Sequence, residues 1–298
     1  MSQGAAGTGP GAAVAVVGHA EWAEFVRVDR VPVAGEIVHG ESIGRLAAGG
    51  GAVAAVQIAR LCGGCLFVTA LGGDEAGEKV APNLEDRGVE VHAARRKAPQ
   101  RRAFVYVDSG GERTITTIGE RHGAKGGDDL PWQRFDRLDS VYFTAGDAGA
   151  LRAARRSKVL VATVRARDAL SEAGVAVDVL VASANDRGER YSRGDFDPAP
   201  TWVVRTDGPL GGSLEAADGS TTRWRSLPVE GPPGDSYGAG DSFAAGLACG
   251  LGMGYDIAES ISLGAFCGAS AVHGTGPYGS QASAGDLPRW RGLYGIDR

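Results

Sequence analysis

A run of small residues at positions 234–246 is the segment of this chain whose residue types and spacing most clearly suggest chemistry. Gly238, Ala239 and Gly240 have little or no side chain, so a ligand can approach their backbone closely. Apolar residues follow at helical spacing over 243–251. The first N–H groups of such a helix have no partner within it and lie at the positive end of its dipole. We therefore predict an anion site in this turn, and a phosphate group suits it.

Asp241 lies in the same predicted first turn. The free N–H groups and the helix dipole favour the ionised form of its carboxylate. An ionised aspartate beside a phosphate site could accept the proton of an attacking hydroxyl, as a general base does. The alternative interpretation is a tight turn whose aspartate only caps the helix.

The residues around the turn favour the first interpretation. Segment 235–241 (DSYGAGD) resembles the C-terminal motif of the ribokinase-like (phosphofructokinase-B-type) carbohydrate kinases, usually Asp-Thr-x-Gly-Ala-Gly-Asp, with Ser236 in place of the threonine. The resemblance implies transfer of the γ-phosphoryl group of ATP to an alcohol, with Mg²⁺ as a cofactor. It also implies that a monovalent cation such as K⁺ can bind near Asp235 and Ser236.

Further glycine-rich segments are similar to other elements of this family and occur in the family's order. Segments 49–54 (GGGAVA) and 70–77 (ALGGDEAG) resemble its Gly-Gly substrate turn and its Gly-x-Asp element, and 206–212 (TDGPLGG) resembles its nucleotide-binding turn. The sequence has no Gly-Lys dipeptide of a Walker-type loop and no G-x-G-x-x-G after a strand. By resemblance, the acceptor-binding residues include Gly50, Gly51, Ala54 and Asp241, and the nucleotide-binding residues are Asn185, Thr206, Gly208, Gly211, Gly238 and Gly240.

One family element is incomplete in this chain. The family commonly carries an Asn-x-x-Glu element linked to magnesium and phosphate, and here Asn185 is present but Gly188 stands where the acid should be. Asp186 or Glu189 could act in its place through a water molecule. The alternative is that both are ordinary solvent-facing residues.

The expected sugar site departs further from the family. Ala23 stands where an aspartate is usual, Ala54 where an asparagine is common, and Ala145 near the position of a glutamate in ribokinases. These changes remove polar partners for a pentose, yet a hydroxyl needs a partner that holds it for attack. The remaining candidates for polar anchors of the acceptor are Glu21, Glu24 and Asp147.

Two side chains near this site have alternative interpretations. Trp22 favours a flatter or more apolar ligand, such as a nucleoside or an aromatic alcohol, unless it is a buried core tryptophan. We interpret His19 as structural.

Composition excludes several other classes of protein. The 298 residues are 43% hydrophobic, enough to bury a large core. A net charge of −5 argues against a general nucleic-acid binder. No run approaches membrane-spanning length, and residues 1–12 are Gly/Ala-rich without the pattern of a signal peptide. We therefore expect a cytoplasmic protein with no nucleic-acid or membrane partner.

Two local clusters have simple structural explanations. Cys62 and Cys65 form a C-x-x-C without a second pair that would complete a metal site, and we interpret them as buried small residues. Five basic residues lie within 95–102, which is typical of a solvated loop between strands. A patch that steers phosphate groups is the alternative.

Apolar runs that are typical of buried strands alternate with amphipathic, helical stretches along most of the chain. This order predicts an α/β fold with a central, mostly parallel sheet and helices on both faces, as the family resemblance also implies. We expect a flexible tail at 1–12 and a single domain at 13–298. Segments 33–43 and 103–118 alternate instead and predict a small β lid, unless they form an ordinary edge hairpin.

These observations together predict an ATP-dependent kinase that phosphorylates a sugar, a nucleoside or a related small alcohol. Asp241 is the predicted base, and the turn 238–240 is the predicted anion hole. A metabolite sensor that keeps the fold without turnover is the alternative, which Gly188 and the altered sugar site favour. The lid strand places Phe104 and Tyr106 on one face and Val105 and Val107 on the other, and the resemblance implies that such lids often pair across a two-fold axis. We therefore expect a homodimer through this sheet, unless the lid folds onto the core of its own chain.

Overall fold

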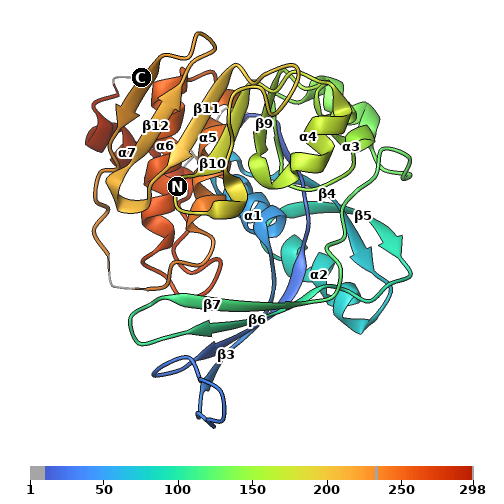
Figure 1. Cartoon of the computed structure of the whole chain (residues 1–298), viewed down its shortest axis with the longest axis vertical. Coiled ribbons are helices and arrows are strands. Elements are labelled where there is room, and N and C mark those ends of the chain that lie inside the picture. The colour runs from blue at the N-terminus through green and yellow to red at the C-terminus, as the bar shows by residue number, and fades with distance from the viewer. Residues whose placement is uncertain (1–10, 232–233, 297–298) are drawn as a thin grey trace, which may run out of the picture.

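The computed structural model describes residues 11–231 and 234–296, and the expected tail at 1–12 falls almost wholly outside them. Within the described residues, a nine-stranded sheet has the order β13-β12-β11-β10-β9-β8-β1-β4-β5 (Figure 1). The pairs from β11 to β5 are parallel, and β12 and β13 continue the sheet antiparallel. The strands are β1 (Val14–Val17), β4 (Cys65–Gly72), β5 (Val89–Arg96), β8 (Ser140–Phe143), β9 (Val159–Thr163), β10 (Val179–Ser183), β11 (Trp202–Thr206), β12 (Gly212–Glu215) and β13 (Thr221–Trp224).

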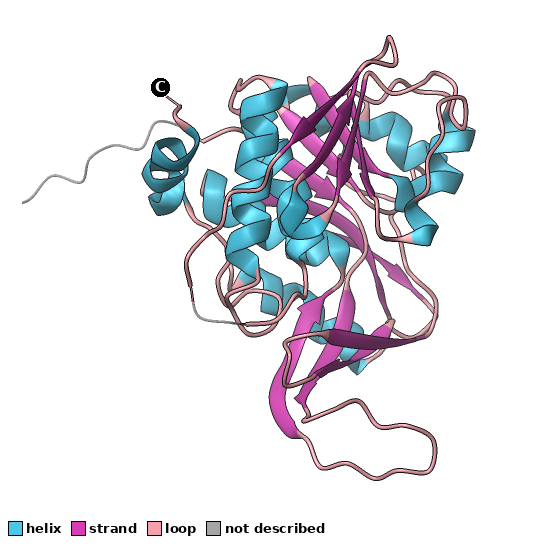
Figure 2. Cartoon of the chain, turned by 60° about the vertical axis from the view of Figure 1, so that its left-hand side comes forward, coloured by secondary structure: helices cyan, strands magenta, loops and turns pink. Residues whose placement is uncertain are grey.

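Helices cover both faces of this sheet (Figure 2). Strand β1 is uniformly apolar because both of its faces are buried. Val14 and Val16 belong to the core on one face of the sheet, and Ala15 and Val17 belong to the core on the other. One face packs against α1 (Gly50–Cys62), α2 (Glu75–Glu85), α5 (Ala239–Gly252), α6 (Ile257–Ala271) and α7 (Leu287–Tyr294), and the other against α3 (Ala148–Ala154) and α4 (Arg167–Ala173). The predicted α/β fold is confirmed.

A second, four-stranded sheet projects from this core, in the order β3-β2-β6-β7 (Figure 1). Its strands are β2 (Glu21–Arg27), β3 (Glu41–Ala48), β6 (Arg102–Val107) and β7 (Arg113–Ile118). The predicted hairpin at 103–118 is present. The prediction of a strand at 33–43 is wrong for most of its length, because 31–40 form a loop in which Val33 and Ile37 are exposed. Strand β2 lies outside both predicted lid segments, and β3 overlaps the first of them only at 41–43.

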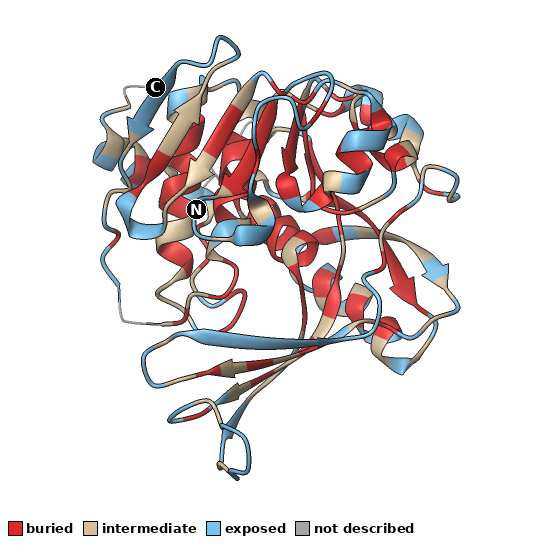
Figure 3. Ribbon diagram, in the orientation of Figure 1, coloured by how far each residue is buried: buried red, intermediate tan, exposed pale blue. Residues whose placement is uncertain are grey.

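The two faces of the projecting sheet differ in burial. Val105 and Val107 are buried within the chain, on the face that also holds Phe25. The Phe25 ring packs edge-on against Tyr237, with 5.0 Å between ring centroids, so this face is part of the chain's own core. Phe104 and Tyr106 lie half-buried on the opposite face, and β7 is exposed along its length (Figure 3). Substituting lysine for both Val105 and Val107 would therefore disrupt the core of one chain and would not test a contact between chains.

The remaining sequence predictions concern the cysteines and membrane insertion. Cys65 is buried as predicted, whereas Cys62 is partly exposed and its Sγ lies 3.2 Å from that of Cys249 on α5. Among the described residues, no helix combines the length and apolar character needed to span a bilayer.

Candidate active site

The N-terminus of α5 forms the predicted anion-binding turn. Gly238 is the N-cap residue and adopts a left-handed conformation, with φ 77°. A Cβ atom there would lie 2.7 Å from Cγ1 of Val53, so only glycine fits. A Cβ atom on Gly240 would meet nothing within 4 Å, which shows open space beside the first turn. Within the described residues, the N–H groups of Gly240 and Asp241 have no backbone acceptor, so they are available to an anion.

The carboxylate of Asp241 lies over the N-terminus of α1. A Cβ atom on Gly50 would come within 2.7 Å of Oδ1 of Asp241, so Gly50 makes room for the carboxylate. Burial raises the pKa of Asp241 to about 6, although the charges of Arg165 and Arg113 lower it. The group is therefore mostly ionised at neutral pH and close to the pKa at which a general base works best.

The glycine turn before α1 lies against two side chains, one from the projecting sheet and one from the segment that leads to it. A Cβ atom on Gly49, which has φ 89°, would lie 3.1 Å from Cγ of Glu21 and 3.2 Å from the imidazole of His19. Oε1 of Glu21 forms an ion pair with Nε of Arg101 at 2.8 Å and lies 3.7 Å from Nε2 of His19. Burial raises the pKa of Glu21, and Arg101 opposes that shift. These two side chains thus border the glycine turn that the sequence analysis assigns to the acceptor.

The imidazole of His19, which the sequence analysis interprets as structural, is largely buried beside this turn. Burial, followed by the charges of Arg121, Arg101 and Arg165, lowers its pKa to about 3, so its imidazole is neutral at physiological pH. Its Nδ1 atom is buried without a hydrogen-bond partner in the described chain. A buried polar atom of this kind can bind a ligand hydroxyl.

Two of the predicted polar anchors lie elsewhere. Glu24 is on the outer face of β2, where its carboxylate pairs with Arg45 at 3.1 Å, because successive residues of a strand alternate between faces. Asp147 caps α3: its Oδ1 accepts hydrogen bonds from the N–H groups of Ala150 and Gly126, each at 2.8 Å. Of the three candidates, only Glu21 faces the glycine turn before α1, over which the Asp241 carboxylate lies.

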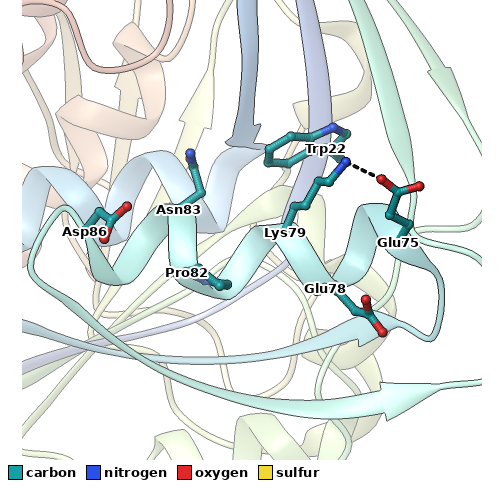
Figure 4. Close-up of a pocket in the computed structure, with 7 residues that line it drawn as sticks. All are labelled: Trp22, Glu75, Glu78, Lys79, Pro82, Asn83 and Asp86. Atoms are coloured by element: carbon teal, nitrogen blue, oxygen red, sulfur yellow. Dashed lines mark hydrogen bonds and ion pairs between the residues drawn. The ribbon is translucent and has the colours of Figure 1, made fainter.

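Other predicted acceptor residues serve packing. Ala54 is fully buried and cannot contact a ligand, and a Cβ atom on Gly51 would lie only 2.7 Å from the backbone carbonyl oxygen of His19. Trp22 lies on the outer face of β2, where it lines a surface pocket of about 350 Å³ together with residues of α2 (Figure 4). The expectation that Trp22 selects an aromatic acceptor at the Asp241 site is therefore wrong, and so is the assignment of Ala54.

The predicted nucleotide residues gather at the carboxyl ends of β10 and β11. Ser183 and Thr206 pair at the ends of these strands, and Asn185 follows with its Nδ2 donating to Oδ1 of Asp207 at 3.2 Å. Gly208 has φ 54° and open space around it. Gly211 differs, because its Cβ would lie 2.2 Å from the carbonyl oxygen of Trp224. Glycine at this position therefore permits the close packing of β12 and β13.

Arg165 is a charged residue near the site that the sequence analysis did not identify, and it lies two residues before the start of α4 at Arg167. It lies in a short turn after β9 and pairs with both Asp186 and Glu189. Glu189 also accepts a hydrogen bond from the Ser183 N–H at 2.7 Å. A polar residue directly after a buried parallel strand was the available clue, since such positions meet at one edge of the sheet.

The site offers no dedicated metal position. Across 11–231 and 234–296, no three or more histidine, cysteine, aspartate or glutamate side chains are arranged to hold an ion. Asp186 and Glu189, the carboxylates nearest the incomplete magnesium element, are both bound by Arg165. The donor set therefore does not fit a magnesium ion held by protein ligands.

The side chains of Asp235 and Ser236, near which the sequence predicts a monovalent cation, make internal contacts. The carboxylate of Asp235 is buried, and its two oxygens accept the N–H groups of Tyr237 at 3.0 Å and Gly276 at 2.6 Å. The Ser236 hydroxyl accepts a hydrogen bond at 2.7 Å from Nη1 of Arg113, at the start of β7. These contacts fix the turn before α5 and connect the projecting sheet to it.

Comparisons with known proteins show which family and fold this chain resembles. A family model described as pfkB family carbohydrate kinase matches residues 12–192 and 198–283. An ATP-dependent ribose-1-phosphate kinase of Halopiger xanaduensis is 28% identical over 271 residues, covering 85% of this chain and 89% of that protein. A ribokinase of Dictyostelium discoideum is 32% identical over 108 residues, which is 36% of this chain and 34% of that protein. The structure of an Arabidopsis thaliana ribokinase complexed with ribose and ATP has a TM-score of 0.73 at 20% identity, covering 94% of this chain and 98% of the other.

Proposed function

We infer the activity from the family: the chain belongs to the pfkB family of carbohydrate kinases. We propose that it transfers the γ-phosphoryl group of ATP to a hydroxyl of a sugar or a related small polyol. Relatives named as ribokinase and as ribose-1-phosphate kinase support a sugar as acceptor. The observation that carries the proposal is the Asp241 carboxylate, whose pKa is raised to about 6, beside free N–H groups at the start of α5.

Each part of the site would have a separate task. Phosphoryl transfer passes through a loose transition state that needs positioning and charge stabilisation more than covalent chemistry. The N–H groups at the start of α5 would stabilise the transferring phosphoryl group, and Asp241 would take the proton of the attacking hydroxyl. The ends of β10 and β11, with Asn185 and Thr206, would border the nucleotide. Mg²⁺ would enter with the phosphates of ATP and offset their charge.

The acceptor would bind on the opposite side, between the turn 49–51 and β2. Glu21 is held by Arg101 and faces Gly49, and the unpartnered Nδ1 of His19 is nearby. These groups could position a hydroxyl for attack. Neither Glu24 nor Asp147 takes part in this proposal.

A sensor that binds the same ligands without turnover is the second candidate. One observation favours it: Arg165 neutralises both Asp186 and Glu189, the carboxylates that could help to position the metal of bound ATP. The intact base at Asp241 favours the kinase, because a sensor has no need of a proton acceptor beside an anion site.

A screen for ADP release over sugars, polyols and nucleosides, with Asp241→Asn as the matched control, tests the two candidates. A kinase gives acceptor-dependent ADP release that falls roughly 10²- to 10⁴-fold in the variant, the usual scale for the loss of a general base. Calorimetry with ATP runs in parallel. ATP binding without acceptor-dependent ADP release by the wild-type protein would reject the kinase and retain the sensor.

A further inference from the structure

Cys62, which the sequence pairs with Cys65 in a C-x-x-C, has a different neighbour in the fold. Its Sγ lies 3.2 Å from Sγ of Cys249, a residue 187 positions further along the chain. Cys65 opens β4, where its Sγ lies 3.6 Å from the carbonyl oxygen of Leu66. Cys62 and Cys249 are both free thiols. The fold thus brings together two thiols that no sequence motif joins.

The gap between these two sulfur atoms is small enough for a bond to form. A disulfide holds its sulfur atoms about 2.05 Å apart, so the two must approach each other by roughly 1 Å. Cys62 is the last residue of α1 and Cys249 lies inside α5, and the two helices pack directly against each other. The movement can be divided between the two side chains, since each thiol turns about a single bond. Bond formation therefore needs no refolding of either helix.

The two thiols differ in exposure, which assigns them different roles. Cys62 is partly exposed and can meet a small oxidant, whereas Cys249 is fully buried. Burial also raises the pKa of the Cys249 thiol, which therefore stays protonated at neutral pH. A reaction with an oxidant in solution begins at Cys62, and Cys249 is the thiol that completes the disulfide.

A bond at this place would join the two helices whose N-termini form the candidate site. A Cβ atom on Gly50, the first residue of α1, would lie 2.7 Å from Oδ1 of Asp241 in the first turn of α5. Cys62 lies about 18 Å along α1 from Gly50, from the rise of about 1.5 Å per residue. Cys249 lies about 12 Å along α5 from Asp241 by the same measure. The bond would therefore fix one helix against the other at the far end from the site.

We propose that Cys62 and Cys249 form a reversible disulfide, with a hydroperoxide as the oxidant and a low-molecular-weight thiol as the reductant, and that this bond stabilises the folded chain. The inference does not depend on the proposed kinase function. The stabilisation arises because the bond closes a loop of 187 residues, which restricts the unfolded chain far more than the folded one.

The chemistry takes two steps. The Cys62 thiolate attacks one oxygen of the hydroperoxide and the O–O bond breaks. Cys62 becomes a sulfenic acid, and the departing oxygen takes up the proton that Cys62 released. The Cys249 sulfur then attacks the sulfur of Cys62, the S–O bond breaks, and the departing hydroxide leaves as water with the proton of Cys249. The two thiols lose two electrons and the peroxide gains them, and exchange with two thiols of the reductant restores both cysteines.

Thiol titration and peptide mapping of the full chain test the proposal. The protein is reduced, freed of reductant, treated with hydrogen peroxide, denatured and alkylated before digestion. Of the four cysteines, we expect two to be lost to titration, with a peptide that links Cys62 to Cys249, and dithiothreitol should reverse both changes. Retention of all four thiols, a bond between Cys62 and Cys65, or irreversible oxidation of Cys62 alone would overturn the proposal.

Two variants separate the roles of the thiols. In Cys249→Ala, peroxide should leave Cys62 as a sulfenic acid that dimedone traps, and no disulfide should form within the chain. Cys65→Ala is the matched control, because Cys65 is also buried, and it should form the disulfide as the wild-type protein does. Loss of the disulfide in Cys65→Ala would refute the assignment of Cys249, and the wild-type peptide map decides the pairing even if Cys249→Ala does not fold.

Melting curves of the oxidised and the reduced protein test the consequence for stability. The oxidised wild-type protein should melt about 5 °C or more above the reduced protein. Cys62→Ala should melt at the same temperature before and after peroxide treatment, since it lacks the thiol that reacts first. An oxidised wild-type protein that carries the disulfide but melts at or below the reduced one would reject the stabilising role.

Discussion

Replacing Asp241 with asparagine should greatly reduce turnover and, at neutral pH, make the folded protein more stable. Burial raises the pKa of Asp241 from 3.8 to about 6, so the native state binds this proton more tightly than the unfolded chain does. The ionised carboxylate therefore destabilises the folded protein above pH 6. The penalty disappears as the pH falls below the unfolded pKa near 4, where both states are protonated.

The expected gain in stability of the Asp241→Asn protein follows from the rise in the pKa of Asp241. One pKa unit corresponds to about 1.4 kcal/mol, so the shift sets an upper limit of about 3 kcal/mol at pH 8. Because the side chain retains some access to water, we expect about 1–2 kcal/mol in practice. A protein of this length gains about 2–4 °C in Tm for each kcal/mol. The Asp241→Asn protein should thus melt roughly 2–8 °C above the wild type at pH 8 and equal to it near pH 4.

Melting curves of the ligand-free proteins between pH 4 and pH 8 provide the assay. Asp147→Asn is the control, because asparagine caps a helix as well as aspartate does and the variant should keep the wild-type Tm. ADP release by Asp241→Asn, measured in parallel, should fall roughly 10²- to 10⁴-fold. A variant that melts at or below the wild-type temperature at pH 8 would show that the carboxylate is not held in a desolvated position.

Three further outcomes are expected. Gly50→Ala places a methyl group 2.7 Å from Oδ1 of Asp241, so kcat should fall at least tenfold while ATP affinity stays within about twofold of wild type. An unchanged kcat would show that the space at Gly50 does not position the Asp241 carboxylate for catalysis. Ala239→Asp should weaken ATP far more than the acceptor, since a carboxylate would oppose the phosphates at the start of α5, and equal losses by calorimetry would mean that the anion hole lies elsewhere. If the chain forms a homodimer through its projecting sheet, the half-buried outer face is the surface available, and the double substitution Phe104→Lys, Tyr106→Lys should give monomers by light scattering. A wild-type protein that is already monomeric at micromolar concentration would end the dimer proposal.

The sequence by itself determined the fold class and the base with its turn. Uniformly apolar runs such as 14–17 are typical of strands buried on both faces, and their alternation with helices predicts a parallel sheet. The glycine at 238 and the aspartate at 241 were recognisable because a helix N-terminus is a local feature: its free N–H groups and its dipole arise from a few consecutive residues.

Only the tertiary structure decided which side chains meet at the acceptor side. The sequence did not distinguish Glu21, Glu24 and Asp147 as candidate anchors of the acceptor. In the structure, the alternation of β2 turns Glu24 outward, and the carboxylate of Asp147 caps α3. The ion pair between Arg101 and Glu21, which also lies beside His19, joins residues about 80 positions apart. Such a cluster has no local pattern, because its charges meet only when β2 and the segment before β6 come together in the projecting sheet.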